Sequence, residues 1–192
     1  MQISEQHLAR MRVPKTHWES SLDKIPNACG HKSVMTRYLQ NIYQHIEVCT
    51  GLLLFGEYSS GKSALASLCL KYAAHAGVIG YWISAADLPR YQIEGEMFDE
   101  ELTCYERART VPLLVIDEYF MRREMKWTED AVDALVRSRI DEVRCTIITT
   151  NHAPSQIEES RPALAAALRE ATYPVKVAGH DFRTQIMKGK KI

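Results

Sequence analysis

One stretch constrains the fold of this chain more than any other, and it reads Gly56-Glu57-Tyr58-Ser59-Ser60-Gly61-Lys62-Ser63. It matches the P-loop pattern G-x-x-x-x-G-K-[ST] at every specified position. An apolar run at 52–55 precedes it, and apolar side chains recur at helical spacing over 64–76. A strand, a glycine loop and a helix in this order present backbone N–H groups and a helix N-terminus to an anion. The stretch therefore predicts a site for nucleotide phosphates.

The P-loop pattern assigns individual roles within this site. We expect the loop from Gly56 to Ala64 to surround the phosphates, with Lys62 reaching the β- and γ-phosphates. The Ser63 hydroxyl is expected to bind Mg²⁺, so the predicted cofactors are ATP and Mg²⁺. Many such loops carry a third glycine where Ser59 stands. The alternative is a flexible loop that binds nothing, and the strand and helix around the motif argue against it.

Composition and charge exclude several classes of protein. The 192 residues carry 24 Lys and Arg against 24 Asp and Glu, so the net charge does not favour nucleic-acid binding. Binding to nucleic acid would need a local basic patch. The five cysteines form no C-x-x-C pair and predict reduced thiols rather than a zinc site. The N-terminus has no signal-peptide pattern, and no apolar run reaches the length of a membrane span. We expect a cytoplasmic protein without membrane contact.

Strands and helices are predicted in alternation along the chain. Besides the strand at 52–55, strands are expected at 78–84, 111–117, 145–150 and 173–177. Helices are expected at 4–11, 33–48, 64–76, 98–108, 128–143, 162–171 and 180–187, with a short one starting near Ala85. Such alternation is typical of a parallel sheet that helices cover on both faces. The predicted fold class is therefore α/β, a three-layer sandwich with a five-stranded parallel sheet.

Acidic residues follow the strand at 111–117. Four apolar residues, 113–116, lead into Asp117 and Glu118, which is the Walker B pattern. We expect Asp117 to hold Mg²⁺ together with Ser63, and Glu118 to accept a proton from an attacking water as the general base. The alternative is an ordinary strand that ends in exposed acids. The functional interpretation is favoured because ligands of parallel sheets bind beyond the carboxyl ends of the strands, where the P-loop also lies.

A neutral amide follows the strand at 145–150. Asn151 would orient the same water or contact the γ-phosphate, because the carboxyl ends of parallel strands share one edge of the sheet. The alternative is a turn residue that opens the loop before Pro154. The phosphate site predicted at this edge favours the functional role.

The chain resembles the AAA+ ATPases at Gly56–Ser63, Leu113–Glu118 and Thr149–Asn151. It further resembles the DnaC-type helicase loaders and the related IstB-type transposition helper ATPases at Pro14–Asp23, Thr146–Asn151 and Gly179–Arg183. The resemblance covers about residues 12–187 and implies a P-loop NTPase fold of the AAA+ type. We divide the chain into an N-terminal arm at 1–30 and an ATPase core at 31–192, and we expect no separate helical lid after Arg183.

The resemblance also implies roles for arginines. Arg183 matches the sensor-2 arginine that contacts nucleotide phosphates from the same subunit, and Arg139 matches an arginine that faces a neighbouring subunit. For both, the alternative is an ion pair on the surface. The helix before the last strand usually carries an arginine finger, but alanines fill it here and only Arg161 and Arg169 are available. Without a finger, the chain would bind ATP and hydrolyse it slowly.

The same resemblance implies partners. It implies a replicative helicase and single-stranded DNA as ligands, and a homo-oligomer that forms with ATP. The segment 88–109 falls where loaders carry a helix facing single-stranded DNA, and it holds both arginines and acids. Aromatic side chains with cations favour DNA, whereas the acids favour a solvated surface for most of this segment. Either residues 1–11 serve as a short helicase-binding helix, or the partner differs.

Other functions use the same core motifs. An IstB-like transposition helper would have a transposase as its partner. A nucleotide-gated binding module with little turnover fits the missing arginine finger. A small-molecule P-loop kinase fits least, because such kinases need an arginine-bearing lid and an acceptor site, and the sequence indicates neither. The leading interpretation is an ATPase that loads a replicative helicase.

Overall fold

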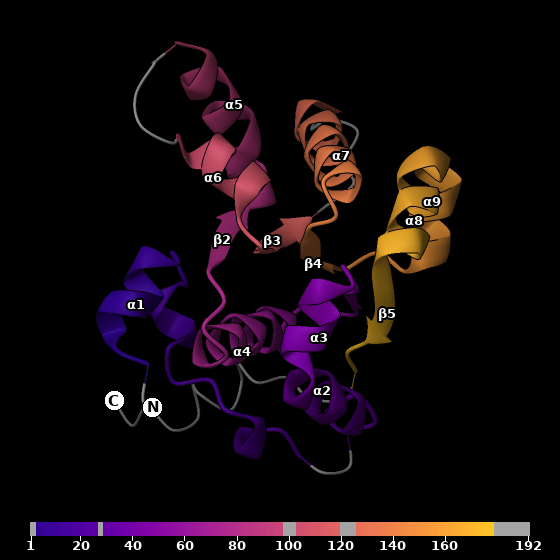
Figure 1. The fold of residues 1–192 in the computed structure, drawn as a ribbon. Helices are drawn as coiled ribbons and strands as arrows, with labels where there is room; N and C mark the ends of the chain where they lie inside the picture. Colours follow the sequence, from indigo (N-terminus) through magenta and orange to yellow (C-terminus); the bar gives the residue numbers. More distant parts are fainter. Residues whose placement is uncertain (1–2, 27–28, 98–102, 120–125, 179–192) are drawn as a thin grey trace, which may run out of the picture.

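A parallel sheet organises the fold (Figure 1). In the computed structural model, which describes residues 3–26, 29–97, 103–119 and 126–178, the strands lie in the order β2-β3-β4-β1-β5 and pair in parallel. The strands are β1 (Gly51–Phe55), β2 (Gly80–Ser84), β3 (Leu113–Tyr119), β4 (Cys145–Thr150) and β5 (Thr172–Lys176). The predicted α/β fold with a five-stranded parallel sheet is confirmed.

Helices cover both faces of the sheet and make three layers (Figure 1). On one face lie α1 (Glu5–Arg10), α2 (His31–Gln40), α3 (Ile42–Glu47) and α4 (Lys62–His75). On the other face lie α5 (Leu88–Met97), α6 (Cys104–Thr110), α7 (Lys126–Asp141), α8 (Pro154–Ser160) and α9 (Pro162–Ala171). Short 3₁₀ turns occur at η1 (Lys15–His17), η2 (Leu22–Lys24) and η3 (Ala85–Asp87). Among the described residues, no helix has the length and apolar character needed to cross a bilayer.

The double cover explains the apolar runs of the strands. In β1, Leu52 and Leu54 are buried with the helices of one layer, and Leu53 is buried with those of the other. In β3, Leu113 and Leu114 divide between the two layers in the same way. Because successive side chains of a strand point to opposite faces, a strand covered on both faces needs apolar residues at consecutive positions.

Two described segments differ from the predicted helices. The helix predicted at 33–48 is two helices, because Asn41 leaves helical geometry (φ −112°, ψ 25°) and its side chain donates to the Arg37 carbonyl. α8 was not predicted, although Pro154 suits the first position of a helix. The helix predicted at 180–187 lies outside the described residues, as do residues 98–102 of another.

The N-terminal arm folds back along the edge of the sheet. α1 lies within the helix predicted near its start, and the Ser4 hydroxyl accepts a hydrogen bond from the His7 amide. The Met11 carbonyl accepts a hydrogen bond from the Trp82 amide of edge strand β2 at 2.9 Å. Val13 is buried in the same apolar cluster as the helices of this face. The arm therefore contributes to the core and covers part of an exposed strand edge.

Arg12 fixes the arm to the helices beyond β2. Its guanidinium donates to the hydroxyls of Tyr91 (2.6 Å) and Tyr81 (3.2 Å) and to the Cys104 sulfur (3.1 Å). The guanidinium also lies over both tyrosine rings, 5.1 Å and 5.9 Å from their centres. Since Tyr91 lies on α5 and Cys104 on α6, the arm contacts β2, α5 and α6 at one point.

Val143 holds an unfavourable backbone conformation after α7. Its φ is 54°, in the left-handed region that β-branched residues avoid, and the residue is 66% exposed. We expect Val143→Gly to raise the free energy of unfolding by about 1 kcal/mol, because the strain is removed and little packing is lost. Urea unfolding measures the change. Val48→Gly is the control, because Val48 is 68% exposed but has φ −93°, and a loss of stability in Val143→Gly would contradict the strain.

Candidate nucleotide-binding site

The P-loop joins β1 to α4 in the expected order of strand, loop and helix. Two glycines are required by its shape. Gly61 has φ 93°, and a side chain on Gly56 would lie 2.1 Å from the Val177 carbonyl oxygen. Ser59 is also left-handed, with φ 60°, which explains why a glycine is common at this position. The loop is therefore held in a tight conformation that its glycines permit.

Lys62 begins α4 and is buried against the inside of the loop. Its ammonium donates to the carbonyls of Glu57 (2.6 Å) and Gly56 (2.9 Å) and to the Ser60 hydroxyl (3.3 Å). The positive charge thus lies within a loop at the N-terminus of a 14-residue helix, where the helix dipole adds to it. Such an arrangement favours an anion, and a phosphate group has the matching chemistry.

A β-bulge at the end of β3 turns Glu118 toward the same region. The pairing of β3 with β4 changes register between Ile116 and Tyr119, and Glu118 has φ 58°. A bulge of this kind re-aims one side chain, and the exposed Glu118 lines a cavity beside the P-loop. The amide freed by the bulge donates to the Thr149 hydroxyl on β4 at 2.9 Å.

Thr149 links the two acidic residues of the Walker B stretch. Its hydroxyl accepts from the Glu118 amide and donates to the Asp117 carboxylate at 2.6 Å. Burial raises the pKa of Asp117 above its usual value, and hydrogen bonds with Thr149 and Ser63 oppose that rise. The sequence predicted no separate role for Thr149, although Thr149 belongs to the Thr149–Asn151 stretch at the strand end that carries the resemblance.

The Ser63 hydroxyl acts on the nearby Asp117 carboxylate, lowering its pKa, so the two side chains present oxygen atoms to one place. Mg²⁺ takes oxygen ligands, usually one or two carboxylates with waters and substrate phosphates, so this pair fits Mg²⁺ held together with a nucleotide. Among the residues that the structure describes, no group of three or more His, Cys, Asp and Glu could hold a metal. A metal centre built from protein side chains alone is therefore not indicated in that part of the chain.

A cavity of about 470 Å³ brings these groups together, within the size range of small-molecule sites. It is lined by the P-loop and the start of α4, by Glu118, and by the end of β4 through Asn151. The Asn151 side-chain nitrogen is buried and has no hydrogen-bond partner among the described residues. Because a buried donor without a partner is costly, this amide points to a ligand oxygen.

The N-terminal arm supplies the rest of the cavity lining, and the sequence did not predict this. The lining residues of the arm are Thr16, His17, Glu19, Ser20, Ser21, Lys24 and Ile25, and His31 at the start of α2 lies next to them in the lining. Ile25 and His31 share the cavity with Leu65 and Leu68 of α4, which makes part of it apolar. Burial lowers the pKa of His31, which favours the neutral imidazole. The only sequence signal for this wall was the resemblance at Pro14–Asp23.

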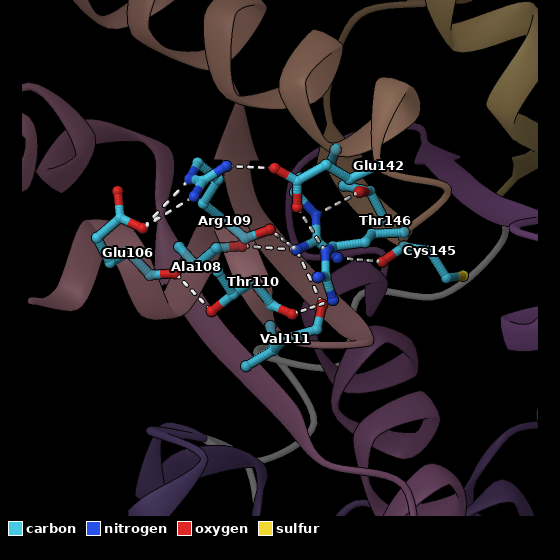
Figure 2. Close-up of polar contacts among 10 residues, drawn as sticks. Glu106, Ala108, Arg109, Thr110, Val111, Glu142, Cys145 and Thr146 are labelled. Atoms are coloured by element: carbon cyan, nitrogen blue, oxygen red, sulfur yellow. Dashed lines mark hydrogen bonds and ion pairs between the residues drawn. The ribbon is translucent and has the colours of Figure 1, made fainter. Parts of the chain in front are cut away.

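The prediction that Arg139 faces a neighbouring subunit is wrong. Arg139 is fully buried at the N-terminal ends of β3 and β4, which is the opposite edge of the sheet from the P-loop. Its guanidinium donates at 2.7–3.0 Å to the carbonyls of Ala108, Arg109, Val111 and Cys145 and to the Thr146 hydroxyl (Figure 2). It therefore satisfies carbonyls at the end of α6 that the helix leaves unpaired. Burial lowers the pKa of Arg139, and these acceptors hold the charge without a carboxylate.

Ion pairs cover the same corner of the fold (Figure 2). Glu142 pairs with Arg109 and, at 2.9 Å, with Arg144, and Arg109 also pairs with Glu106 at 3.2 Å. The Arg144 guanidinium donates as well to the Thr110 carbonyl at the end of α6. Each pair is partly exposed, so each contributes little alone. This corner joins α6 and α7 to the sheet and has no part in the nucleotide site.

The other predicted arginines differ in accessibility. Arg183 lies outside the described residues. Arg161 directly precedes α9, and its side chain is 19% exposed and pairs with three acids of α7, the nearest being Asp130 at 2.9 Å. Arg169 pairs with Glu158 at 2.6 Å, and its side chain is 61% exposed. Arg161 is therefore engaged within its own chain, and Arg169 is the more accessible of the two.

Comparison with known proteins places this geometry in a fold family. No protein-family model and no curated protein sequence matches the chain. Solved structures do match. The crystal structure of the DnaC helicase loader has a TM-score of 0.72 at 20% identity, covering 86% of this chain and 100% of that one. The fold is that of the DnaC-type AAA+ proteins.

Two further structures agree with this AAA+ fold. The crystal structure of DnaI has a TM-score of 0.73 at 17% identity, covering 88% of this chain and 93% of that chain. AMPPCP-bound DnaA from Aquifex aeolicus has a TM-score of 0.67 at 16% identity, covering 89% of this chain and 54% of that one. At these identities the likeness concerns the AAA+ fold.

Removal of the Thr149 hydroxyl tests the arrangement of the candidate site. Thr149→Val removes the hydroxyl that donates to the Asp117 carboxylate and accepts from the Glu118 amide. We expect the free energy of unfolding to fall by about 1–3 kcal/mol, because buried polar groups lose their partner. Thr149→Ser keeps the hydroxyl and should lose about 1 kcal/mol or less. Urea unfolding measures both, and equal stability of the two variants would show that the hydroxyl contributes nothing.

Asp117 is expected to lower the stability of the protein at neutral pH. Because its pKa is raised in the folded state, stability is lost as pH rises from its ordinary pKa through the raised value. Asp117→Asn, which keeps an acceptor for Thr149, should therefore be more stable than the wild type at neutral pH. Urea unfolding over a pH series measures this.

Glu142 provides a control of opposite sign for this pH experiment. A hydrogen bond from Arg144 lowers the pKa of Glu142, so its charge favours the folded state above its ordinary pKa. Glu142→Gln should then be less stable than the wild type at neutral pH. A loss of stability in Asp117→Asn under the same conditions would mean that burial of the Asp117 charge is not a cost.

Proposed function

We propose that this AAA+ core binds ATP together with Mg²⁺ and hydrolyses it. The observation that carries the proposal is the chain of contacts from Ser63 through Asp117 and Thr149 to Glu118, at the cavity that Lys62 also lines. It brings a hydroxyl, a buried carboxylate, an exposed carboxylate and an ammonium to one place. These are the groups that hold a metal-bound triphosphate and activate a water.

Each group has one role in the proposed reaction. Lys62 binds oxygens of the β- and γ-phosphates, and the Asn151 amide donates to the γ-phosphate or to the attacking water. Glu118 accepts the proton of that water as the general base. Ser63 and Asp117 hold Mg²⁺, which neutralises phosphate charge when it is bound. Arg183, near the end of the given sequence, is proposed to contact the phosphates bound to its own subunit.

The apolar part of the cavity is proposed to hold the base of the nucleotide. Ile25, Leu65 and Leu68 supply apolar surface there, and the neutral imidazole of His31 lines the same cavity. A flat heterocycle fits such surroundings, because ligand pockets combine apolar walls with a few polar groups. The phosphates and the base would then lie at two ends of one continuous cavity.

In the cell, we propose that the protein loads a replicative helicase onto single-stranded DNA in the cytoplasm and assembles into a homo-oligomer with ATP. The likeness to the DnaC helicase loader and to DnaI supports a loader. The likeness to a replication initiator, DnaA bound to AMPPCP and single-stranded DNA, supports nucleotide and DNA as ligands. An IstB-like helper would use the same site with a transposase as its partner.

A nucleotide-gated binding module with little turnover is the second candidate function. It is favoured by Arg161, which is tied to three acids of its own chain and is not free to serve a neighbouring site. An arginine supplied to a phosphate site accelerates hydrolysis by about 10³–10⁵. Arg169 is accessible but already pairs with Glu158. In such a binding module, bound ATP would control partner binding and would be hydrolysed only slowly.

Two variants separate ATP binding from ATP hydrolysis. Lys62→Ala should raise the Kd for ATP by about tenfold or more, because a buried charge at the phosphate site is lost. Glu118→Gln should bind ATP like the wild type and lower kcat by about 10²–10⁴-fold, because the general base is lost. A fluorescent ATP analogue measures binding and phosphate release measures turnover. Wild-type affinity in Lys62→Ala would refute the P-loop assignment, and absence of turnover in the wild type would favour the binding module.

Partner capture tests the proposed cellular role. Glu118→Gln should hold the ATP state, so the variant is used as bait with and without ATP, with Lys62→Ala as the matched control. Enrichment of a hexameric replicative helicase only with ATP and only with Glu118→Gln supports the loader. Enrichment of a transposase instead would support the IstB-like alternative and overturn the loader.

A further inference from the structure

The helix that follows the P-loop also holds the N-terminal arm. The Lys71 ammonium on α4 donates to the carbonyls of Trp18 (2.5 Å) and Ser20 (3.0 Å). Lys71 is half-buried, and burial lowers its pKa. A charged donor bonded to two backbone carbonyls in a partly buried place is a strong contact, because hydrogen bonds to charged groups contribute more than neutral ones.

The arm depends on contacts of this kind for its shape. Between 15 and 24 it has only the short turns η1 and η2 and pairs with no strand. Other fixed points in this region are the Trp18 indole, which donates to the Val13 carbonyl at 2.8 Å, and Lys32, which donates to the Ile25 carbonyl at 2.6 Å. A segment without regular pairing opens locally at low cost unless such contacts hold it.

The two carbonyls that Lys71 binds lie within the cavity wall. Ser20 lines the cavity, and Trp18 stands between His17 and Glu19, which also line it. Lys71 itself does not line the cavity and lies nine positions after Lys62, or about 14 Å along the helix axis. Lys71 therefore shapes the cavity from outside it.

We propose that Lys71 is a positioning residue for nucleotide binding, which holds the arm as a wall of the cavity through the Trp18 and Ser20 carbonyls. The proposal rests on the proposed function, because it assumes that the cavity binds ATP. Lys71 determines how tightly the cavity encloses the nucleotide, since a wall already in place need not be ordered on binding. It has no part in the proton transfer at Glu118, so its effect falls on affinity and not on turnover.

Lys71→Met tests the proposal, because methionine keeps the apolar stem and removes both hydrogen bonds. We expect the Kd and the KM for ATP to rise by about tenfold, with kcat at saturating ATP unchanged. Lys71→Arg keeps a charged donor and should restore affinity. Lys15→Met is the matched control, because Lys15 is an exposed lysine of the same arm, and it should leave Kd unchanged. An unchanged Kd in Lys71→Met, or a fall in kcat without a change in KM, overturns the proposal.

Hydrogen exchange of the wild-type protein tests the same proposal without a variant. ATP should slow exchange of the backbone amides at 16–21, because a bound nucleotide holds the wall that Lys71 positions. Equal exchange with and without ATP, in a protein that binds ATP, overturns the proposal even if Lys71→Met does not fold. If the wild type binds no ATP at all, the proposed function itself fails, so the two failures are distinguishable.

Discussion

The Thr149 hydroxyl is the contact on which the candidate site depends. It joins β3 to β4 at their carboxyl ends, where it accepts from the Glu118 amide and donates to Asp117. Without it, a buried carboxylate would lose one of its donors and an amide freed by a bulge would lose the hydroxyl that accepts from it. The sheet order then places β1, and with it the P-loop, on the other side of β4. One side chain thus sets both acidic groups in register with the phosphate loop.

Two buried charges at opposite edges of the sheet differ in what satisfies them. Arg139 is buried among carbonyl acceptors from α6 and β4, so its charge helps to close the fold. Asp117 is buried with the Thr149 hydroxyl as a donor, and burial raises its pKa. Near it, the Asn151 amide has no partner among the described residues. A fold tolerates incompletely satisfied groups mainly where a ligand completes them, which distinguishes the edge with the P-loop from the edge with Arg139.

Strands and helices that have a sequence signal within their own residues were predicted well. Contacts that a side chain makes with backbone carbonyls far away in the sequence were not predicted. The strand at 145–150 and the helix at 162–171 occur at the predicted residues, because a β-branched run and a proline at a helix start are local signals. The burial of Arg139 depends on carbonyls of α6 and β4, and any residue can supply a carbonyl. The sequence did not predict that the arm lines the cavity, for the same reason. Lys71 holds the arm through backbone carbonyls, which any residue can supply. The P-loop pattern could be read from residue types, but the partners that position it could not.

The N-terminal arm joins two parts of the molecule that the sheet keeps apart. Lys71 ties the arm to the P-loop helix, and Arg12 ties it to α5 and α6 on the opposite face (Figure 1). A ligand in the cavity affects α5 and α6 only through contacts that differ between the bound and free states. The described part of the arm contains no strand of the sheet, so these contacts can change without unpairing any of the five strands. Coupling along this route would change contacts of the arm, whereas coupling through the sheet would change the pairing of the strands.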